Sequence, residues 1–486
     1  METASPSFLD QWLHERFSPA PAWEVAVRDQ AQVLARLERG ECDGLLPDFW
    51  LEPDDLLHFA LELGAFDVFT TLPDPRKRRT IAAPLLGKVL LAGSLPDCPS
   101  LRQIGTTVFH SAVLLDHLGV NFFAIREGGA RTGDERPFDI EALGDYLAKL
   151  TLADYTDHAQ RVALWLRSQE ELQGTTWAID CVDIRIPKGR VPHGHVAETR
   201  HLKVAVLSVL TARGALPLLW QFGTPKEGDI SLAKPLWETA VTLWGAGACR
   251  ELLVDAGFVD GEWLASLHEQ GTTVITRVRE GMDPFTAALA YVAAHPDQVW
   301  REAEIPRRPA GKSRPLRREI TGLTEWPGWD SFGRDLALCL VRDTYADGTV
   351  DIWCLMSTDP LATARSIYDA FRRRWHLEEI FMALSRYHGF NALPASRLGV
   401  ACARAHALFF AYTLRWLCRQ QAKRQQLVNG AKPWRRRTPD LILYAGGAFA
   451  VLKPSVVLAI ILTHAEVWVT RRDEILAAVR YCEGDD

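Results

Sequence analysis

The stretch from Thr175 to Val278 constrains the fold more than any other part of this chain of 486 residues. It begins with three short runs rich in Val, Ile, Leu and Trp, bounded by Pro and Gly, which is typical of consecutive β-strands. Helical and strand-like patterns then alternate, and this order predicts an α/β sheet with antiparallel and parallel parts. The predicted strands are 175–186, 202–211, 216–222, 251–254 and 272–278, and the predicted helices are 230–244 and 261–269.

Apolar residues at helical spacing dominate on both sides of that stretch. A Pro-rich and Arg-rich segment with further strand-like runs follows it and is interpreted as an insertion. The predicted parts are a helical N-terminal unit (1–75), a second helical region (76–173), a core (174–279 and 363–400), a β-rich insertion within the core (280–362) and a helical C-terminal region (401–486).

The composition is that of a folded protein. Hydrophobic residues make up 48% of the chain and charged residues 24%, which argues against disordered and fibrous classes. The first residues lack the pattern of a signal peptide, so we expect a cytoplasmic protein. The best membrane candidate, Val456 to Leu462, has only seven apolar residues, far fewer than the ~20 that span a bilayer, and predicts a buried helix. The nine cysteines form no C-x-x-C pair, which predicts reduced core thiols.

The net charge of −6 argues weakly against a nucleic-acid partner, because phosphate binding depends on Lys and Arg. Local basic runs would have to supply such binding. A single run is often only a solvated face. Four runs occur in this acidic chain: Arg76 to Arg79, Arg301 to Arg318, Arg372 to Arg374 and Arg415 to Arg437.

Two aspartates follow predicted strands. Asp180 ends the run Thr-Thr-Trp-Ala-Ile and Asp255 ends Glu-Leu-Leu-Val, so both carboxylates are expected at the tips of strands in one sheet. For either residue alone, capping of the next turn is the ordinary interpretation. Asp183 competes with Asp180 but faces the opposite side of an alternating strand. Asp260 is placed to cap the helix that begins at Gly261.

A long helix predicted over 362–388 carries a third acid. Phe371, Arg374, Glu378 and Ser385 are spaced by 3, 4 and 7 residues, which places them on one helix face. The alternative interpretation is an amphipathic helix in which Arg374 and Glu378 form an i,i+4 pair worth about 0.2–0.5 kcal/mol.

In these residues the chain resembles DDE transposases of the insertion-sequence-four family. The family's mark on its last catalytic helix is Tyr, two residues, Arg, three residues, Glu, six residues and Lys. Phe371, Arg374, Trp375, Leu377 and Glu378 are in register with this pattern. Phe371 stands where Tyr is usual, and Ser385 stands where Lys is usual.

The two aspartates lie in segments that also resemble this family. Asp255-Ala-Gly257-Phe258 is similar to the signature around its second catalytic Asp, and Asp180 in Ala-Ile-Asp matches the first. The resemblance covers roughly residues 170 to 420, and the helical part before it is similar only loosely.

The resemblance implies a ribonuclease H-like catalytic core and DNA cleavage and joining by two-metal phosphoryl transfer. Asp180 would bridge two Mg²⁺ ions, Asp255 would hold one and Glu378 the other, and Mn²⁺ would substitute. A water would cut the transposon end, and the released 3′ hydroxyl would attack target DNA. The implied partners are the terminal inverted repeats and target DNA. They would be bound by a homodimer that is nucleoid-associated when on DNA, with residues 76–173 serving DNA binding or dimerisation.

The expected DNA contacts are Phe371, Arg374, Trp375 and Arg386. Arg374 is expected to bind a phosphate next to the scissile bond, because a guanidinium is permanently charged and can bond two oxygens. Arg386 could replace the lysine that is absent at Ser385. Trp326 and Trp329 could stack on an unpaired base, although ordinary packing is the simpler interpretation.

Two other functions remain open. The changes at Phe371 and Ser385 allow a degenerate transposase copy that binds DNA without cleaving it. An unrelated metal-dependent nuclease on the same fold is the third possibility. Magnesium-dependent nicking of DNA carrying the element's ends separates the first two functions, and transfer of those ends to a new site separates the third.

Overall fold

The computed structural model describes residues 27–48, 51–77, 79, 81–95, 98, 100–109, 118, 138–169, 174–186, 201–211, 214–305, 314–388, 390, 393, 397–424, 440–468 and 472–483. The chain divides into two compact units. The sheet unit is Leu150–Thr413, and the terminal unit combines Met1–Lys149 with Leu414–Asp486.

The described residues of the sheet unit form one nine-stranded sheet in the order β5-β4-β3-β6-β7-β11-β10-β9-β8. β3, β4 and β5 pair antiparallel, whereas β6 runs parallel to β3 and β7 runs parallel to β6. The strands predicted between Thr175 and Val278 are confirmed. The strands are β3 (Thr176–Arg185), β4 (His201–Thr211), β5 (Gly214–Gly223), β6 (Glu251–Leu253), β7 (Thr273–Val278), β8 (Arg301–Glu302), β9 (Arg317–Pro327), β10 (Asp335–Thr344) and β11 (Val350–Ser357).

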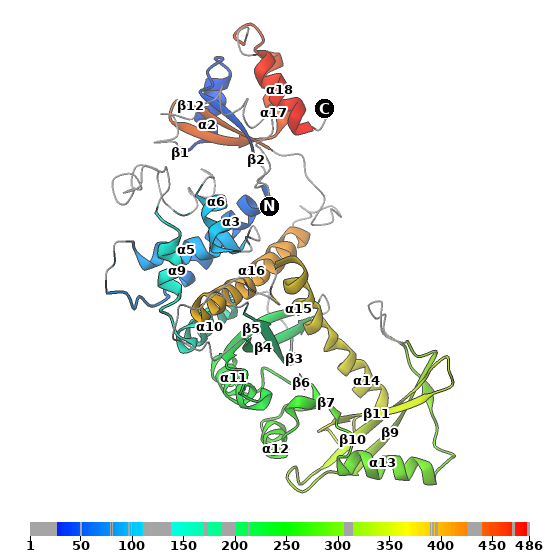
Figure 1. Ribbon diagram of the computed structural model, residues 1–486. Helices are drawn as coiled ribbons and strands as arrows, with labels where there is room; N and C mark the ends of the chain where they lie inside the picture. The colour runs from blue at the N-terminus through cyan, green and yellow to red at the C-terminus, as the bar shows by residue number, and fades with distance from the viewer. Residues whose placement is uncertain are drawn as a thin grey trace. The chain divides into compact units, whose positions relative to one another are not determined.

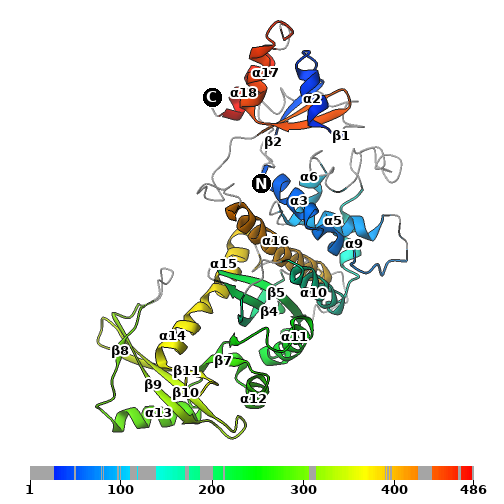
Figure 2. The same cartoon turned by 180° about the vertical axis from the view of Figure 1, so that it is seen from behind.

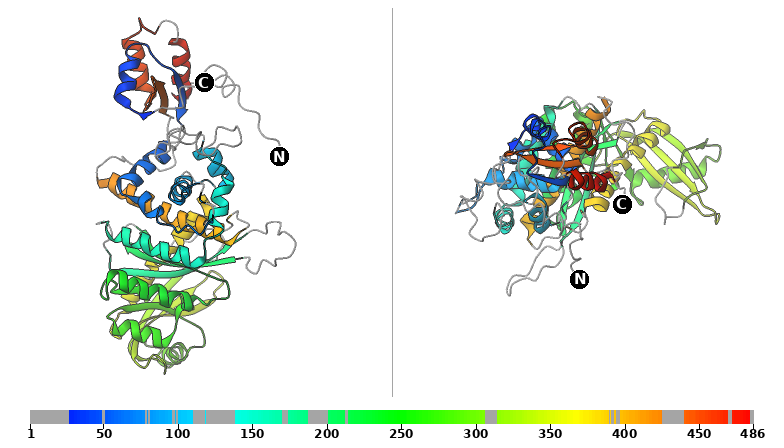
Figure 3. Two further views of the ribbon diagram at one scale, coloured as in Figure 1. Left: turned by 90° about the vertical axis from the view of Figure 1, so that its left-hand side faces the viewer. Right: turned by 90° about the horizontal axis from the view of Figure 1, so that it is seen from above.

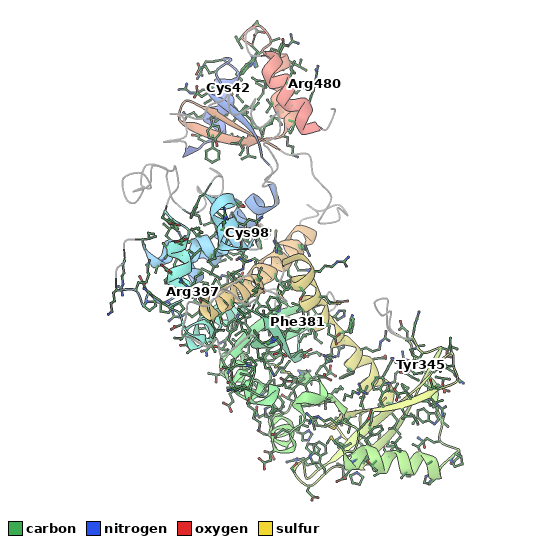
Figure 4. The ribbon with its side chains drawn as sticks, in the orientation of Figure 1. Cys42, Cys98, Tyr345, Phe381, Arg397 and Arg480 are labelled. Atoms are coloured by element: carbon green, nitrogen blue, oxygen red, sulfur yellow. The ribbon has the colours of Figure 1, made fainter. Side chains whose placement is uncertain are left out.

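Residues 280–362 continue this sheet. β11 pairs antiparallel with β7, and β10 and β9 follow in antiparallel order. The β-rich character predicted for the segment is confirmed, and the segment also contains helix α13 (Asp283–Ala294). It does not form a separate part, because β11 supplies backbone partners that the edge of β7 would otherwise lack. Figure 4 labels Tyr345 at the turn between β10 and β11, where its amide donates to Thr349 O at 2.9 Å.

Helices cover both faces of the sheet. α11 and α12 lie on one face, and α14 and α15 lie on the other (Figure 1, Figure 2 and Figure 3). Residues 204–210 of β4 are consequently all buried, as expected for a strand covered on both faces. The helices predicted over 230–244 and 261–269 are confirmed. The helical elements are α10 (Leu152–Arg167), α11 (Asp229–Trp244), the 3₁₀-helix η2 (Ala256–Phe258), α12 (Gly261–Glu269), α14 (Ala364–Arg373), α15 (Trp375–His388) and α16 (Leu398–Arg424).

The single long helix predicted over 362–388 is wrong in one respect. α14 ends at Arg373 and α15 begins at Trp375, so Arg374 lies at a break. At this break the Arg374 amide donates to Phe371 O at 3.1 Å, and the Leu377 amide donates to Arg374 O at 2.9 Å. Such three-residue hydrogen bonds tighten the helix locally. Arg374 keeps right-handed helical dihedrals, with φ −56° and ψ −29°, so Phe371, Arg374 and Glu378 still lie on one side as predicted.

The terminal unit contains a second, four-stranded sheet among its described residues, in the order β1-β13-β12-β2. Its strands come from both ends of the chain: β1 (Val27–Arg28), β2 (Gly44–Asp48), β12 (Asp440–Ala445) and β13 (Ala448–Leu452). The helical character predicted for 1–75 and 401–486 is confirmed only in part, because these four strands were not predicted. Apolar side chains of both ends share one core, including Val33, Leu37, Leu45, Leu443, Ala450, Ile461 and Val479. The spacing of apolar residues within one end of the chain cannot reveal a partner strand that lies at the other end.

The helices of the terminal unit agree better with the sequence. They are α2 (Gln30–Leu37), α3 (Leu51–Glu62), α4 (Ala65–Phe69), α5 (Ala83–Ser94), α6 (Leu101–Val108), α9 (Glu141–Leu147), α17 (Pro454–Thr463) and α18 (Arg472–Glu483). The helical character of residues 76–173 is confirmed where the structure describes them, and residues 110–117 and 119–137 lie outside. α17 confirms a helix at Val456 to Leu462, but these two end residues are 40% and 54% exposed. The helix is therefore half-buried rather than buried.

No helix in the described part of the chain combines the length and the apolar character needed to cross a membrane. Of the described cysteines, six are buried and two are partly exposed, which agrees with the predicted core thiols. Figure 4 labels two of the buried ones, Cys42 and Cys98.

Candidate functional site

Asp180 lies within β3 rather than at its tip, because β3 continues to Arg185. The parallel pairing of β3 with β6 nevertheless ends just before it, at Ala178 opposite Leu253. Asp255 follows the end of β6 and begins η2, and its carboxylate accepts a hydrogen bond from the Ala256 amide at 2.8 Å. Both acids therefore lie where the pairing of two adjacent parallel strands ends, and Asp255 also has the capping role that was the ordinary interpretation.

The two faces of β3 separate Asp180 from Asp183. Asp183 lies directly opposite Lys203 in the β3–β4 register, and Lys203 Nζ lies 2.8 Å from Asp229 Oδ1 of α11. Since directly opposed residues of an antiparallel pair share a face, Asp183 lies on the α11 face and is exposed. Asp180 lies on the opposite face, toward α14 and α15, where its carboxylate meets Arg374.

Arg374 joins the first acid to the third. Arg374 Nη1 lies 2.9 Å from Asp180 Oδ2, and Nη2 lies 2.7 Å from Glu378 Oε1. The Arg374 side chain is only 12% exposed, against 19% for Asp180 and 33% for Glu378. The i,i+4 pair that was the alternative interpretation is therefore present, but it is half of a buried bridge. The Arg374 guanidinium carbon also lies 5.4 Å from the centre of the Phe371 ring.

Burial dominates the electrostatics of Asp180. Desolvation raises the pKa of its carboxyl from 3.8 to about 6, although Arg374 and the Cys181 amide oppose this shift. The charges of Asp255 and Glu378 raise the pKa further. Asp255 and Glu378 thus act on Asp180, although burial and Arg374 have the larger effects on its pKa.

The donor types suit a hard divalent cation, which prefers carboxylate oxygens. The arrangement does not yet suit one: within the described ranges, no three His, Cys, Asp or Glu side chains lie together in a geometry that could hold a metal ion. The cation that contacts Asp180 and Glu378 is the guanidinium of Arg374. Asp180, Asp255 and Glu378 could hold a metal only after a rearrangement of this bridge.

The other residues expected to contact DNA in this region differ in their exposure to solvent. Arg386 is exposed, Trp375 is 36% exposed and Phe371 is half-buried under Arg374. Asp260 caps α12 through the Trp263 amide at 2.9 Å, as predicted.

The basic run Arg372 to Arg374 does not form a free basic surface. Arg372 Nη1 lies 3.0 Å from Glu304 Oε2, Arg373 pairs with Glu251 of β6, and Arg374 bridges two acids. Each arginine thus ties the junction of α14 and α15 to a different acidic partner.

Two other basic runs each contain an arginine that is buried in an ion pair. Arg76 is 8% exposed in its side chain and lies 2.8 Å from Asp74. Arg318 forms a buried pair with Asp343, with both nitrogen–oxygen distances at 2.5 Å. Of the fourth run, residues 425–437 lie outside the described part of the chain. The count of basic residues therefore overstated the charge that is available to a partner.

Arg279 was not predicted as a site residue, and it lies next to the segment that carries Asp255. Its Nε donates to Ala256 O at 2.8 Å, next to Asp255. Arg279 and Met282 line a cleft of about 550 Å³ together with Trp329. The Trp329 ring stacks on Phe332 at 5.2 Å, whereas Trp326 packs edge-on against Tyr291 at 5.5 Å. Both tryptophans thus have packing roles, and only Trp329 lines this cleft.

The sheet and these side chains define a mixed α/β protein with a partly buried acid cluster, Asp180, Asp255 and Glu378, at the carboxyl edge of its parallel strands. No family model and no curated protein matches the chain. Among solved structures, the chain is similar to one described as the cryo-EM structure of a piggyBac transposase synaptic complex with hairpin DNA. The TM-score is 0.40 at 11% identity, over 95% of this chain and 85% of that one. A score this low does not establish a shared fold, and function has to be inferred from the sheet order and side-chain geometry.

Proposed function

We propose that the chain is a DDE-class DNA transposase with a ribonuclease H-like core, which cleaves transposon ends and transfers the 3′ hydroxyl strand to target DNA. The strand order β5-β4-β3-β6-β7, with three antiparallel strands followed by two parallel ones, supports such a core. The observation that carries the proposal is geometric: Asp180 and Asp255 lie where the parallel pairing of β3 with β6 ends, and Arg374 joins Asp180 to Glu378 of α15.

The residues would divide the chemistry as follows. Asp180, Asp255 and Glu378 would hold two Mg²⁺ ions, which when bound activate the attacking oxygen and stabilise the leaving oxygen of an in-line displacement. Arg374 carries a permanent charge in a planar fork that fits two phosphate oxygens, so it would orient the scissile phosphate. Sheet and helices leave the Asp180 side chain only 19% exposed, and such partial burial strengthens the charge interactions there.

The proposed partners are the terminal inverted repeats and target DNA, held by a homodimer. The exposed Arg386 and Trp375 are candidate contacts on α15, the helix that carries Glu378. Mn²⁺ is expected to substitute for Mg²⁺, since both accept oxygen ligands in octahedral geometry.

A second candidate is a degenerate copy that binds DNA without cleaving it. Two observations favour it: Phe371 and Ser385 replace the usual Tyr and Lys, and the described acids do not form a ready metal site. This second function would be established if the wild-type chain binds its end DNA but makes no nick in Mg²⁺ or Mn²⁺.

The test is strand cleavage of DNA that carries the sequences flanking the gene. Asp180→Asn, Asp255→Asn and Glu378→Gln should each reduce nicking to background while end binding persists, because binding depends on basic groups and not on these acids. Matched controls are Asp183→Asn and Glu379→Gln, which change exposed acids on the same two elements. Loss of nicking in Asp183→Asn but not in Asp180→Asn would show that the first acid is assigned wrongly.

A further inference from the structure

The guanidinium of Arg374 lies between the carboxylates of Asp180 and Glu378. Its two terminal nitrogens bond Asp180 and Glu378 at 2.9 and 2.7 Å. In the described part of the chain, its polar side-chain contacts are to these two carboxylates alone, and its buried Nε makes no hydrogen bond. A permanent cation therefore sits on the oxygens that a divalent cation would need.

We propose that Arg374 is a displaceable internal cation that keeps Asp180 and Glu378 from binding a divalent metal until a phosphate of bound DNA draws it away. This inference rests on the proposed function and adds a regulation to it: metal loading and DNA binding at this site promote each other. The reciprocity is a thermodynamic requirement when two ligands act on one equilibrium.

The local structure allows such a movement. Arg374 lies at the break between α14 and α15, not within either helix. Its neighbours are fixed separately, because Arg372 pairs with Glu304 and Arg373 with Glu251. A phosphate offers the same two-oxygen geometry as the paired carboxylates, so the guanidinium can exchange one set of partners for the other without loss of its charge-assisted bonds.

Direct binding of Mn²⁺ to the full chain without DNA, followed by electron paramagnetic resonance, tests the first half of the proposal. Arg374→Gln should bind Mn²⁺ about 10-fold or more tightly than wild type, because the competing charge-assisted bonds are gone. Arg374→Lys should lie between them, since an ammonium keeps the charge but cannot bridge both acids. Arg373→Gln, which removes a neighbouring charge outside the bridge, should match wild type.

Two patterns would overturn the inference. One is equal affinity in wild type and Arg374→Gln. The other is a Mn²⁺ affinity of Arg374→Lys equal to that of wild type, together with a gain in Mn²⁺ affinity in Arg373→Gln as large as that in Arg374→Gln. This second pattern would show an unspecific effect of net charge. Asp180→Asn and Glu378→Gln, each placed in the Arg374→Gln background, report whether the bound ion uses these acids. Circular dichroism of every variant confirms folding.

Duplex DNA tests the second half. When duplex DNA is added to wild type, the Mn²⁺ affinity should rise toward that of Arg374→Gln. Mn²⁺ that binds to the DNA alone is measured with Asp180→Asn. Beyond that background, DNA should not raise the Mn²⁺ affinity of Arg374→Gln. If wild type binds Mn²⁺ through Asp180 as tightly as Arg374→Gln does before DNA is added, the inference fails and the proposed function stands. If Arg374→Gln shows no binding that depends on Asp180, with or without DNA, the metal site of the proposed function fails as well.

Discussion

His158 Nδ1 and His406 Nε2 are joined by a buried hydrogen bond of 2.7 Å. Trp220 Nε1 donates to the other ring nitrogen of His406, Nδ1, at 2.9 Å. Because an indole N–H can only donate, His406 Nδ1 must be the acceptor. The His406 proton therefore lies on Nε2, and His406 donates to His158. Both rings must be neutral for this chain of bonds to form.

The first prediction concerns the pH dependence of stability. Burial and the neighbouring His158 hold the pKa of His406 well below 6.5. In the unfolded chain His406 binds a proton below pH 6.5, whereas in the folded chain it does not, so the free energy of unfolding should decrease as pH falls. The contribution of one such group is up to about 1.4 kcal/mol per pH unit. His406→Phe should be less stable at pH 7.5 but should show a shallower decrease below pH 6.5.

Chemical unfolding between pH 5 and 8 measures this difference. His295→Gln is the matched control, because His295 is exposed and its substitution should leave the slope unchanged. Equal slopes in wild type and His406→Phe would show that His406 takes up a proton in the folded chain.

The second prediction concerns Asp180, whose contribution to stability should change with pH in the opposite direction. Its pKa is raised to about 6 from 3.8, so between these values the folded chain keeps a proton that the unfolded chain loses. The stability contributed by this group is present below pH 3.8, decreases as pH rises to about 6 and stays low above. Asp180→Asn should therefore be more stable than wild type at pH 7 in EDTA, by up to about 3 kcal/mol.

The difference between Asp180→Asn and wild type should shrink as pH falls from 6 toward 4, and paired unfolding curves at pH 7 and 4.5 measure it. A variant that is less stable than wild type at pH 7 would contradict the raised pKa. It would instead show that the pair with Arg374 stabilises the fold.

The strands of the main sheet were predictable because their signal is local. β3, β4 and β5 are short apolar runs bounded by Pro and Gly, and burial on both faces keeps such runs apolar. The hairpin of β12 and β13 was missed although Gly446 and Gly447 separate two apolar runs. Their φ values of 59° and 79° are those that a two-residue hairpin turn requires and that glycine adopts readily.

The acid site was only partly predictable for a different reason. The Arg374–Glu378 pair follows from i,i+4 spacing, whereas the bond from Arg374 to Asp180 spans 194 residues and depends on tertiary packing. The break at Arg374 has no Pro or Gly to signal it. The basic runs suggested more free positive charge than the structure has, because their acidic partners, such as Glu251 and Glu304, are distant in sequence.

The third prediction tests a buried ion pair that fixes α14 on the sheet. Arg318 pairs with Asp343, Trp353 Nε1 donates to the same carboxylate at 3.1 Å, and Arg318 Nη1 donates to Tyr368 Oη of α14 at 3.1 Å. Asp343→Leu should lower the free energy of unfolding by about 3–5 kcal/mol, because it leaves a buried unpaired guanidinium.

The double variant Arg318→Met/Asp343→Leu should recover much of that loss, since an apolar pair needs no desolvation. A double-mutant cycle by chemical unfolding measures the coupling. Additive losses in the two single variants would show that the pair does not act as a unit.

The fourth prediction concerns Ser385, where the family that the chain resembles has a lysine. Serine is too short to reach a phosphate, but Arg386 is the next residue of α15, rotated by about 100° around the helix, and it is exposed. We expect Arg386 to supply one phosphate contact. Arg386→Ala should lower end-binding affinity and flatten its dependence on salt by ~0.9 in log–log slope, the change for one phosphate contact on duplex DNA.

Addition of Ser385→Lys to that variant should restore the slope, because a lysine there has the length and charge of the missing group. The matched control is Arg365→Ala on α14, whose guanidinium is already held by Asp369 at 2.7 Å and whose loss should leave the slope unchanged. Fluorescence anisotropy across a salt series measures wild type, these three variants and the single variant Ser385→Lys. An unchanged slope in Arg386→Ala, with a gain in Ser385→Lys alone, would mean that no residue replaces the lysine, and it would favour the degenerate copy over the active transposase.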